Sequence, residues 1–401
     1  MQKKGSRDKM NERGITRILL IIIVLVCVLV VGLATTLIII QINKTNKNEF
    51  NDIENAIENT IIEDKTEEDY TKLDEGVTKQ ELPKIEKNVL ATTDSTIDGR
   101  IPCFYNPVIP EGFKAIGNEE DQTIDINAKW GEQNAYLYGL VIEDKNANQF
   151  VWIPVENMNI FKTTDWQKNA PKETIDPTYT EPTKEDEEEY YKMYYKVKKY
   201  GGFYVGRYET GDLTAQEPRN MTKNSEYIGI KKNLNVYNYV PFKLATINKR
   251  EITGAQELAI KFQEQNEYKT VKTSVMYGVQ WDSMLRFIVS EQNNVNDSTK
   301  WGNYPASELN YQDISGNKYT KKNGSVYLLK TGSSEDTKVK NIYDIAGNVY
   351  EWTKENAGNG VKVARGGAYR ITIGQLAAAR YAYNDNTANS DIGFRISFYI
   401  N

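Results

Sequence analysis

The sequence predicts an α+β fold with few helices and much irregular structure, behind one transmembrane helix. Three observations lead to this prediction. Residues 18–40 form an apolar run of 23 residues without a charged side chain. From residue 137 onward, short segments typical of strands recur between Gly, Asn, Asp and Pro. Only a few segments have the apolar spacing of an amphipathic helix, so strands and loops are expected to dominate.

The composition excludes several kinds of chemistry. The 401 residues include two cysteines and no histidine. A chain without imidazole has no Ser-His-Asp or Cys-His nucleophile and no imidazole-ligated zinc, copper or iron. Two cysteines are too few for an all-thiolate zinc site or an iron–sulfur cluster. We therefore expect no copper, iron or zinc, and oxygen-bound calcium as the metal that the chain is able to hold.

The first expected element is a transmembrane helix at residues 18–42. Its apolar run spans about 35 Å as a helix, which exceeds the roughly 30 Å hydrocarbon core of a bilayer. Residues 1–17 carry six basic and two acidic side chains, so the positive-inside rule places them in the cytoplasm. The net charge of -5 leaves -9 on residues 18–401, which argues against nucleic acid as a partner. The prediction is a single-pass protein of the cell membrane with an extracellular C-terminal domain.

The junction before this helix allows a second interpretation. Residues 13–20, Arg-Gly-Ile-Thr-Arg-Ile-Leu-Leu, resemble the leader junction of type IV pilins and pseudopilins, which are cut after the Gly. The resemblance implies cleavage after Gly14. That family usually carries Glu at the fifth mature position, where this chain has Leu19. An uncleaved anchor and a cleaved, pilin-like helix both stay open.

The rest of the chain divides into a stalk and an exported domain. Residues 43–99 are polar, acidic and nearly free of aromatic residues, and we expect a linker or stalk with one short helix. Residues 100–401 form the exported domain, which is large enough to bury a core although Cys103 has no cysteine partner in it. The acidic run 185–189 suits the N-terminal turn of a helix, with a cation site as the alternative. The expected elements are strands at 137–143, 149–155 and 203–209 and helices at 190–200, 255–265 and 281–290.

The most specific pattern lies near the end of the chain. Residues 341–353 read NIYDIAGNVYEWT, residues 363–369 read VARGGAY, Arg380 follows, and residues 393–395 read GFR. In this order they resemble the formylglycine-generating, or sulfatase-modifying factor, family, whose C-terminal half reads Y-D-M-x-G-N-V-W-E-W, then R-G-G-S, then G-F-R. The resemblance covers about residues 109–401 and is looser before the tail.

The resemblance implies a C-type-lectin-like α+β fold with low regular structure, in which the motif residues are structural. These residues are Asn348, Trp352, Arg365, Gly366, Gly367, Arg380, Gly393, Phe394 and Arg395. Taken alone, the three arginines are also compatible with ordinary pairing to carboxylates.

The chain departs from the catalytic pattern of that family. Its enzymes oxidise a substrate cysteine with a copper-binding cysteine pair that lies shortly after R-G-G. By spacing, this chain has Ile371 and Leu376 at those positions, and Ala368 where the enzymes have Ser. Neither side chain binds Cu(I), which prefers thiolate, and the iron-dependent relatives need histidine. We therefore expect a domain that catalyses neither redox reaction.

The resemblance also implies a structural calcium ion at the tail motif. The ligands would be the side chains of Asp344 and Glu351 and the backbone carbonyls of Gly347 and Val349. Oxygen ligands at such close spacing suit calcium. The alternative is that the two carboxylates pair with arginines. Asn348 is expected to form the turn through hydrogen bonds.

Binding is the expected function of the exported domain. Folds of this kind present loops on a rigid base, and residues 381–391 are rich in Tyr and Asn, which supply stacking faces and adaptable hydrogen bonds. The candidate ligand-binding residues are Tyr381, Tyr383, Asn384, Asp385, Asn386, Asn389 and Asp391. An ordinary solvated loop is the alternative, and the expected ligand is an extracellular glycan, peptide or protein.

Two other functions stay open. The Gly14 junction favours a pilin-like structural subunit of the cell surface. A glycan-acting enzyme would need two carboxyl groups roughly 5–10 Å apart across a cleft. The best-placed acids for that chemistry are Glu209, Asp282, Asp344 and Glu351.

Overall fold

The structure is a computed structural model of the chain, and it describes residues 107–116, 139–163, 187–220, 225–289, 293–372 and 376–401. The chain separates into two units, Met1–Lys72 and Leu73–Asn401, and every described residue belongs to the second. The expected helix at 18–42, the Gly14 junction, the stalk at 43–99, Cys103 and residues 185–186 lie outside the described residues. Within the described ranges, no helix is both long enough and apolar enough to cross a bilayer.

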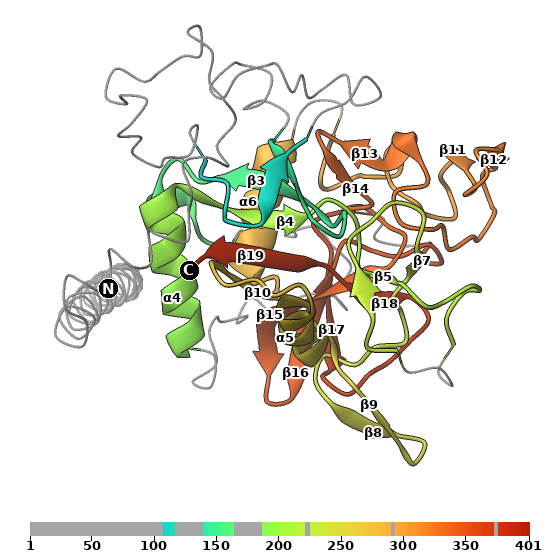
Figure 1. Cartoon of the computed structure of the whole chain (residues 1–401). Coiled ribbons are helices and arrows are strands. Elements are labelled where there is room, and N and C mark those ends of the chain that lie inside the picture. Colours follow the sequence, from blue (N-terminus) through green and yellow to red (C-terminus); the bar gives the residue numbers. More distant parts are fainter. Residues whose placement is uncertain (1–106, 117–138, 164–186, 221–224, 290–292, 373–375) are drawn as a thin grey trace, which may run out of the picture. The chain divides into compact units, whose positions relative to one another are not determined.

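Six strands form the main sheet, and all neighbouring strands pair antiparallel. Their spatial order is β1 (Phe113–Ala115), β2 (Val141–Asp144), β3 (Gln149–Pro154), β4 (Gly202–Gly206), β19 (Ile396–Ile400) and β10 (Val271–Val275). The last strand of the chain, β19, therefore lies inside the sheet, between β4 and β10 (Figure 1). This pairing fixes the end of the tail motif, because Arg395 directly precedes β19.

Three α-helices are described, and they agree with the expected positions to within a few residues. They are α4 (Glu187–Tyr200), α5 (Ala255–Gln265) and α6 (Gly278–Ile288). Helix α5 buries Leu258 and Phe262, and it contacts β10. Helix α6 begins three residues earlier than expected, because the side-chain oxygen of Gln280 accepts the backbone N–H of Tyr277 at 3.0 Å and so caps the first turn. Since α6 contacts both β3 and β15, it is buried on nearly every face.

The tail motif forms a second, four-stranded sheet. Its order is β17 (Arg380–Asn384), β16 (Val361–Arg365), β15 (Tyr350–Gly358) and β18 (Ile392–Phe394). Strands β15 and β18 pair in parallel, and the other pairs are antiparallel. The three sequence motifs thus contribute the neighbouring strands β16, β15 and β18, and Arg380 lies on β17. Glu351 is opposite Arg365, and Arg365 is opposite Arg380.

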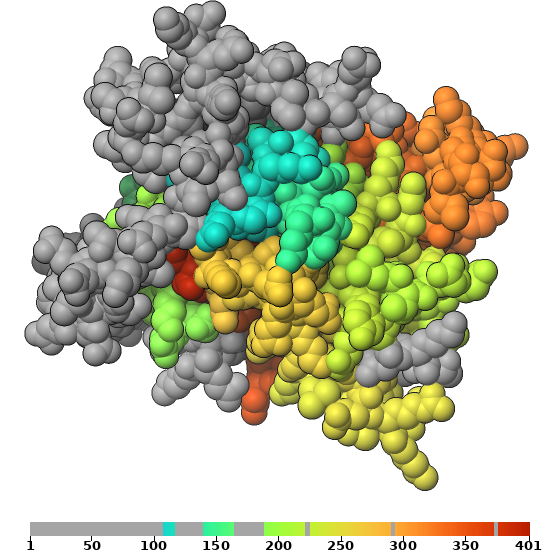
Figure 2. Space-filling view, in the orientation of Figure 1, coloured from blue at the N-terminus to red at the C-terminus, as the bar shows by residue number. Residues whose placement is uncertain are grey.

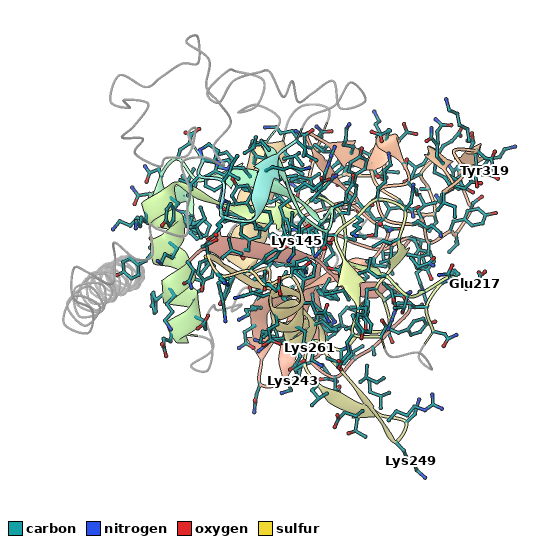
Figure 3. All side chains as sticks on the ribbon, viewed as in Figure 1. Lys145, Glu217, Lys243, Lys249, Lys261 and Tyr319 are labelled. Atoms are coloured by element: carbon teal, nitrogen blue, oxygen red, sulfur yellow. The ribbon has the colours of Figure 1, made fainter. Side chains whose placement is uncertain are left out.

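Short pairs and one three-stranded sheet complete the described fold. They are β5 (Gly211–Asp212), β6 (Ile228–Gly229) and β7 (Asn235–Val236), β8 (Ala245–Ile247) with β9 (Arg250–Ile252), β11 (Leu309–Gln312) with β12 (Lys318–Lys321), and β13 (Lys338–Val339) with β14 (Ile342–Tyr343). The β8–β9 hairpin projects from the neighbouring surface (Figure 2), and Lys249 marks its tip (Figure 3). Two 3₁₀ turns are also described, η1 (Met158–Ile160) and η3 (Glu335–Thr337).

Two apolar clusters form the core. Trp352 lies in the first, together with Tyr350 and Phe394. Trp281 lies in the second, together with Tyr304. All five side chains are fully buried. The prediction of a mixed fold with few helices and many short strands is therefore confirmed for the described residues.

Candidate functional site

The tail motif folds into a buried turn with three left-handed residues. Asp344, Gly347 and Asn348 have φ of 56°, 74° and 57°. The amide of Asn348 connects distant segments, because its nitrogen donates to Glu209 Oε2 at 2.5 Å and its oxygen accepts from Asn303 Nδ2 at 2.9 Å. The turn is therefore held by hydrogen bonds to segments far away in the sequence.

Gly347 is the position in this turn where the structure tolerates a side chain least. A Cβ there would lie 2.3 Å from the carbonyl oxygen of Asn303. We expect Gly347→Ala to lower the free energy of unfolding by at least about 2 kcal/mol, from both the contact and the positive φ. Gly316→Ala is the matched control, because Gly316 has a φ of 83° and open space around it, so strain alone should cost about 1 kcal/mol. Urea unfolding of both variants measures the difference, and equal losses would contradict the role of the Asn303 contact.

Arg395 supplies the positive charge of this turn. Its Nη2 lies 2.6 Å from Glu351 Oε1 and its Nε lies 2.9 Å from Glu351 Oε2, so the pair is bidentate. The guanidinium also donates to the carbonyl oxygens of Gly206, Tyr343 and Asp344 at 2.9, 2.9 and 3.2 Å. Both partners of this ion pair are fully buried.

Three carboxylates surround this single guanidinium: Glu209, Asp344 and Glu351. Burial raises the pKa of Glu209 well above its ordinary value, and the charges of Asp344 and Glu351 raise it further. Burial also raises the pKa of Asp344. Burial raises the pKa of Glu351 as well, to about 7, although Arg395 opposes the effect. We call these three carboxyl groups the acidic cluster below.

The same contacts test whether calcium fits between Asp344 and Glu351. The two Asp344 oxygens accept hydrogen bonds from Thr337 Oγ1 and Gly332 N, both at 2.7 Å. The Glu351 carboxylate is engaged by Arg395. With these oxygens already bound to the protein's own donors, the arrangement does not fit an ion shared by the two carboxylates. It favours the arginine alternative for Glu351, and calcium binding stays a prediction.

The other two motif arginines form a closed ring of ion pairs with Asp282 and Glu355. Arg365 reaches Asp282 at 2.5 Å and Glu355 at 2.8 Å, and Arg380 reaches the same carboxylates at 2.5 and 2.7 Å. All four side chains are at most 4% exposed. This arginine–carboxylate ring joins three strands of the tail sheet to helix α6 without net charge.

The segment 381–391 divides into two parts. Strand β17 places Tyr381 and Tyr383 on the same face, and both lie half-buried with their ring centroids 4.7 and 6.1 Å from that of the buried Tyr350. Asp391 is buried. Burial raises the pKa of Tyr383, and the charge of Asp391 raises it further. Asp385 instead pairs with Lys243 at 2.7 Å. Asn384, Asn386 and Asn389 are exposed.

Sequence reasoning missed three residues of these sites. Arg370 donates to Ser390 Oγ at 2.9 Å and lies 3.6 Å from Asp391, although nothing in its position after R-G-G indicated this. Glu355 completes the arginine–carboxylate ring, and the register of β15 shifts between Trp352 and Asn356, so regular strand alternation does not predict its position. Asn303 carries no sequence signal at all.

The four acids proposed for a glycan-acting enzyme do not face a cleft. Glu209, Asp282, Asp344 and Glu351 are at most 1% exposed. Asp282 and Glu351 are held by arginines, and Glu209 and Asp344 accept hydrogen bonds from the protein. The geometry of these described residues therefore counts against carboxylate catalysis at these positions.

Comparison with known proteins identifies the tail. The family model of the sulfatase-modifying factor enzyme 1-like domain matches residues 300–398, which confirms the resemblance carried by the tail motifs. No curated protein matches the sequence of the chain. Similar solved structures include CarF, with 16% identity over 50% of this chain and 87% of that chain and a TM-score of 0.30. PvdO from Pseudomonas aeruginosa has 13% identity over 65% of this chain and 98% of that chain, with a TM-score of 0.36. Treponema denticola variable protein 1 has 13% identity over 49% of this chain and 84% of that chain, with a TM-score of 0.26.

Proposed function

We propose that the sulfatase-modifying-factor-like domain at residues 300–398, with the strands that complete it, is a non-catalytic recognition module held at the cell membrane. The match to that family supports a C-type-lectin-like formylglycine-generating fold for residues 100–401. The positions that correspond to the catalytic cysteines are Ile371 and Leu376, and the chain has no histidine. A domain that keeps the scaffold of an enzyme without its metal ligands is suited to binding.

One observation carries this proposal: the segment 381–391 presents polar and aromatic side chains over a rigid base. Below Tyr381 and Tyr383 lies the buried Tyr350, and the ring of Tyr383 also packs 6.1 Å from the buried Trp352. Beside them, Arg370 is 53% exposed and turns toward Asp391. Rigid tyrosines beside adaptable polar groups are typical of recognition surfaces. We call Arg370, Tyr381, Tyr383 and Asn384 the tail surface; Asp391, which lies 3.6 Å from Arg370, is buried.

Membrane anchoring is proposed from the sequence. The uncharged run at 18–40 and the six basic residues before it support a single-pass anchor with the domain outside the cell. In this arrangement the tail surface meets extracellular ligands, for which a glycan, a peptide and a protein are the candidate classes. The pilin-like subunit is the alternative function if the chain is cleaved after Gly14.

We expect the tail surface to bind its ligand, and substitutions there to weaken binding at least about tenfold. The full chain is screened against a glycan array and a library of extracellular proteins and peptides, with calcium and then with chelator. Each binder is then tested against Tyr383→Ala and Asn384→Ala. Tyr319→Ala is the control, because Tyr319 is 45% exposed on the separate β11–β12 hairpin (Figure 3).

The outcomes separate the proposals. Loss of binding in the tail variants but not in Tyr319→Ala, with unchanged melting temperatures, supports the tail surface. Loss with chelator alone supports a bound calcium ion. Equal binding by all variants contradicts the assigned surface, and a screen without any binder moves the function to the structural subunit.

A further inference from the structure

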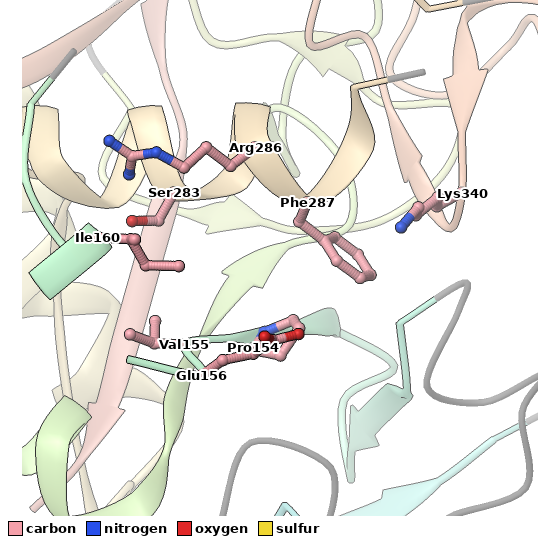
Figure 4. Close-up of a pocket in the computed structure, with 8 residues that line it drawn as sticks. All are labelled: Pro154, Val155, Glu156, Ile160, Ser283, Arg286, Phe287 and Lys340. Atoms are coloured by element: carbon pink, nitrogen blue, oxygen red, sulfur yellow. The ribbon is translucent and has the colours of Figure 1, made fainter. Parts of the chain in front are cut away.

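A pocket of about 260 Å³ lies away from the tail surface, between the end of β3, the turn η1, helix α6 and the turn that joins β13 to β14. Its apolar walls are Pro154, Val155, Ile160 and Phe287 (Figure 4). Two cationic side chains, Arg286 and Lys340, also line it. The volume is slightly below the roughly 300–1,000 Å³ of pockets that hold drug-sized ligands, so it suits a small molecule.

Lys340 is the unusual group of this pocket. Its ammonium lies 3.6 Å from the centroid of the Phe287 ring, and the two side chains face each other in Figure 4. Burial lowers the pKa of Lys340 to about 8, and no described carboxylate opposes that effect. A half-buried ammonium without a counter-ion is destabilised, and the ring face offsets only part of this cost. An anionic ligand would supply the missing partner.

Arg286 adds positive charge at the other end of the pocket. One of its nitrogens donates to the carbonyl oxygen of Lys162 at 2.6 Å, which holds the side chain in place. The acidic side chain on the pocket wall is Glu156, which is exposed. Since the charge of Asp282 also acts on Arg286, the positive potential that favours anions is centred on Lys340.

We propose that this pocket binds a small organic carboxylate whose apolar body lies on Phe287 and Val155 and whose carboxylate pairs with Lys340. The ring of Phe287 and the aliphatic walls suit an aromatic or short aliphatic body. A carboxylate fits better than a phosphate, because a single ammonium neutralises one negative charge. This proposal does not depend on the function of the tail surface.

The test measures binding of benzoate, phenylacetate and hexanoate to the full chain by calorimetry, with benzamide as the neutral isostere. We expect at least one carboxylate to bind saturably and benzamide to bind at least about tenfold more weakly than benzoate. Lys340→Met, which keeps most of the aliphatic stem, should lose at least about tenfold in affinity, whereas Lys340→Arg should retain binding. Lys249→Met on the exposed β8–β9 hairpin is the matched control and should bind like the unchanged chain.

A second readout uses the amine itself. Because its pKa is lowered, Lys340 should react with trinitrobenzenesulfonate faster than Lys249 at pH 8, as followed by peptide mass spectrometry, and a bound carboxylate should slow only the reaction at Lys340. The proposal is overturned if none of the three carboxylates binds more tightly than benzamide, or if Lys340→Met binds them unchanged. Protection of Lys249 to the same extent would also overturn it.

Discussion

Replacing Arg365 with Met is expected to lower the free energy of unfolding by about 3–5 kcal/mol, the range for breaking a buried ion pair from one side. Arg365 is fully buried and binds Asp282 and Glu355 at once. Its removal leaves two carboxylates with Arg380 as their shared guanidinium, and it also removes the hydrogen bond from Nε to the carbonyl oxygen of Ala379 at 3.0 Å. Methionine fills much of the volume, so the loss reports mainly the uncompensated charge.

Arg370→Met is the matched control for this experiment. Arg370 also pairs with an aspartate, but its side chain is 53% exposed and the distance is 3.6 Å. Exposed pairs contribute about 0–1 kcal/mol. Urea unfolding of both variants at pH 7 measures the two losses. A loss below about 1 kcal/mol for Arg365→Met would contradict the assigned importance of the arginine–carboxylate ring.

A double-mutant cycle separates the interaction energy between Arg365 and Asp282 from the cost of leaving a buried charge uncompensated. We combine Arg365→Met with Asp282→Asn, which takes away one of the two carboxylates left without their partner. If the ring acts as a unit, the double variant should be clearly more stable than the sum of the single losses implies. Additive losses would instead show that the two side chains stabilise the fold independently.

Much of the fold was predictable because local patterns agree with tertiary structure. The segment 255–265 has helical spacing and becomes α5, and the segment 149–155 becomes β3. The start of α6 was missed, because its N-cap residue is Tyr277, which has no strong capping preference, although Gln280 at the third helical position caps the first turn. The transmembrane prediction concerns residues outside those that the structure describes.

The candidate sites were predictable only where a motif names the residue. Pairing of the motif arginines with carboxylates was one of the interpretations that the sequence left open. The partners of Arg365 and Arg380 are Asp282 from α6 and Glu355 from β15, and sequence distance says nothing about these contacts. Calcium and arginine both bind carboxylate oxygens, so the pattern around Asp344 and Glu351 predicts either. The sequence did not indicate a binding role for Lys340, since a single lysine in a turn carries no pattern.

The acidic cluster leads to a prediction about pH. Because the pKa of Glu209 is raised in the folded chain and that of Glu351 is raised to about 7, the folded acidic cluster keeps protons that the unfolded state releases at lower pH. The stability that these protons contribute is therefore fully present below the ordinary glutamate pKa. It is lost as the pH rises from about 5 to 8, by up to about 1.4 kcal/mol per pH unit for each group. The chain has no histidine, so imidazole does not titrate in this window.

Glu209→Gln should make this decrease smaller, because the amide neither binds nor releases a proton, and Glu351 accounts for the decrease that remains. The readout is the pH dependence of the free energy of unfolding. The new amide nitrogen must face donors such as Asn348 Nδ2, so the variant is expected to lose stability at every pH. Glu335→Gln is the control: burial raises the pKa of Glu335, but hydrogen bonds from Lys232 and Tyr343 outweigh that effect and lower it to about 2. A glutamate with a lowered pKa is ionised in both states between pH 5 and 8, so this variant should keep the slope of the unchanged chain.

Urea unfolding at pH 5, 6, 7 and 8 measures all three chains. Lys340, with its lowered pKa, adds a slope of the opposite sign only as the pH approaches and exceeds about 8, so it does not account for a decrease below that value. A flat profile for the unchanged chain would mean that Glu209 and Glu351 are both ionised in the fold and that a cation other than Arg395 compensates the acidic cluster. Repeating the series with calcium and with chelator would then identify that cation, because only a bound ion makes the profile depend on the chelator.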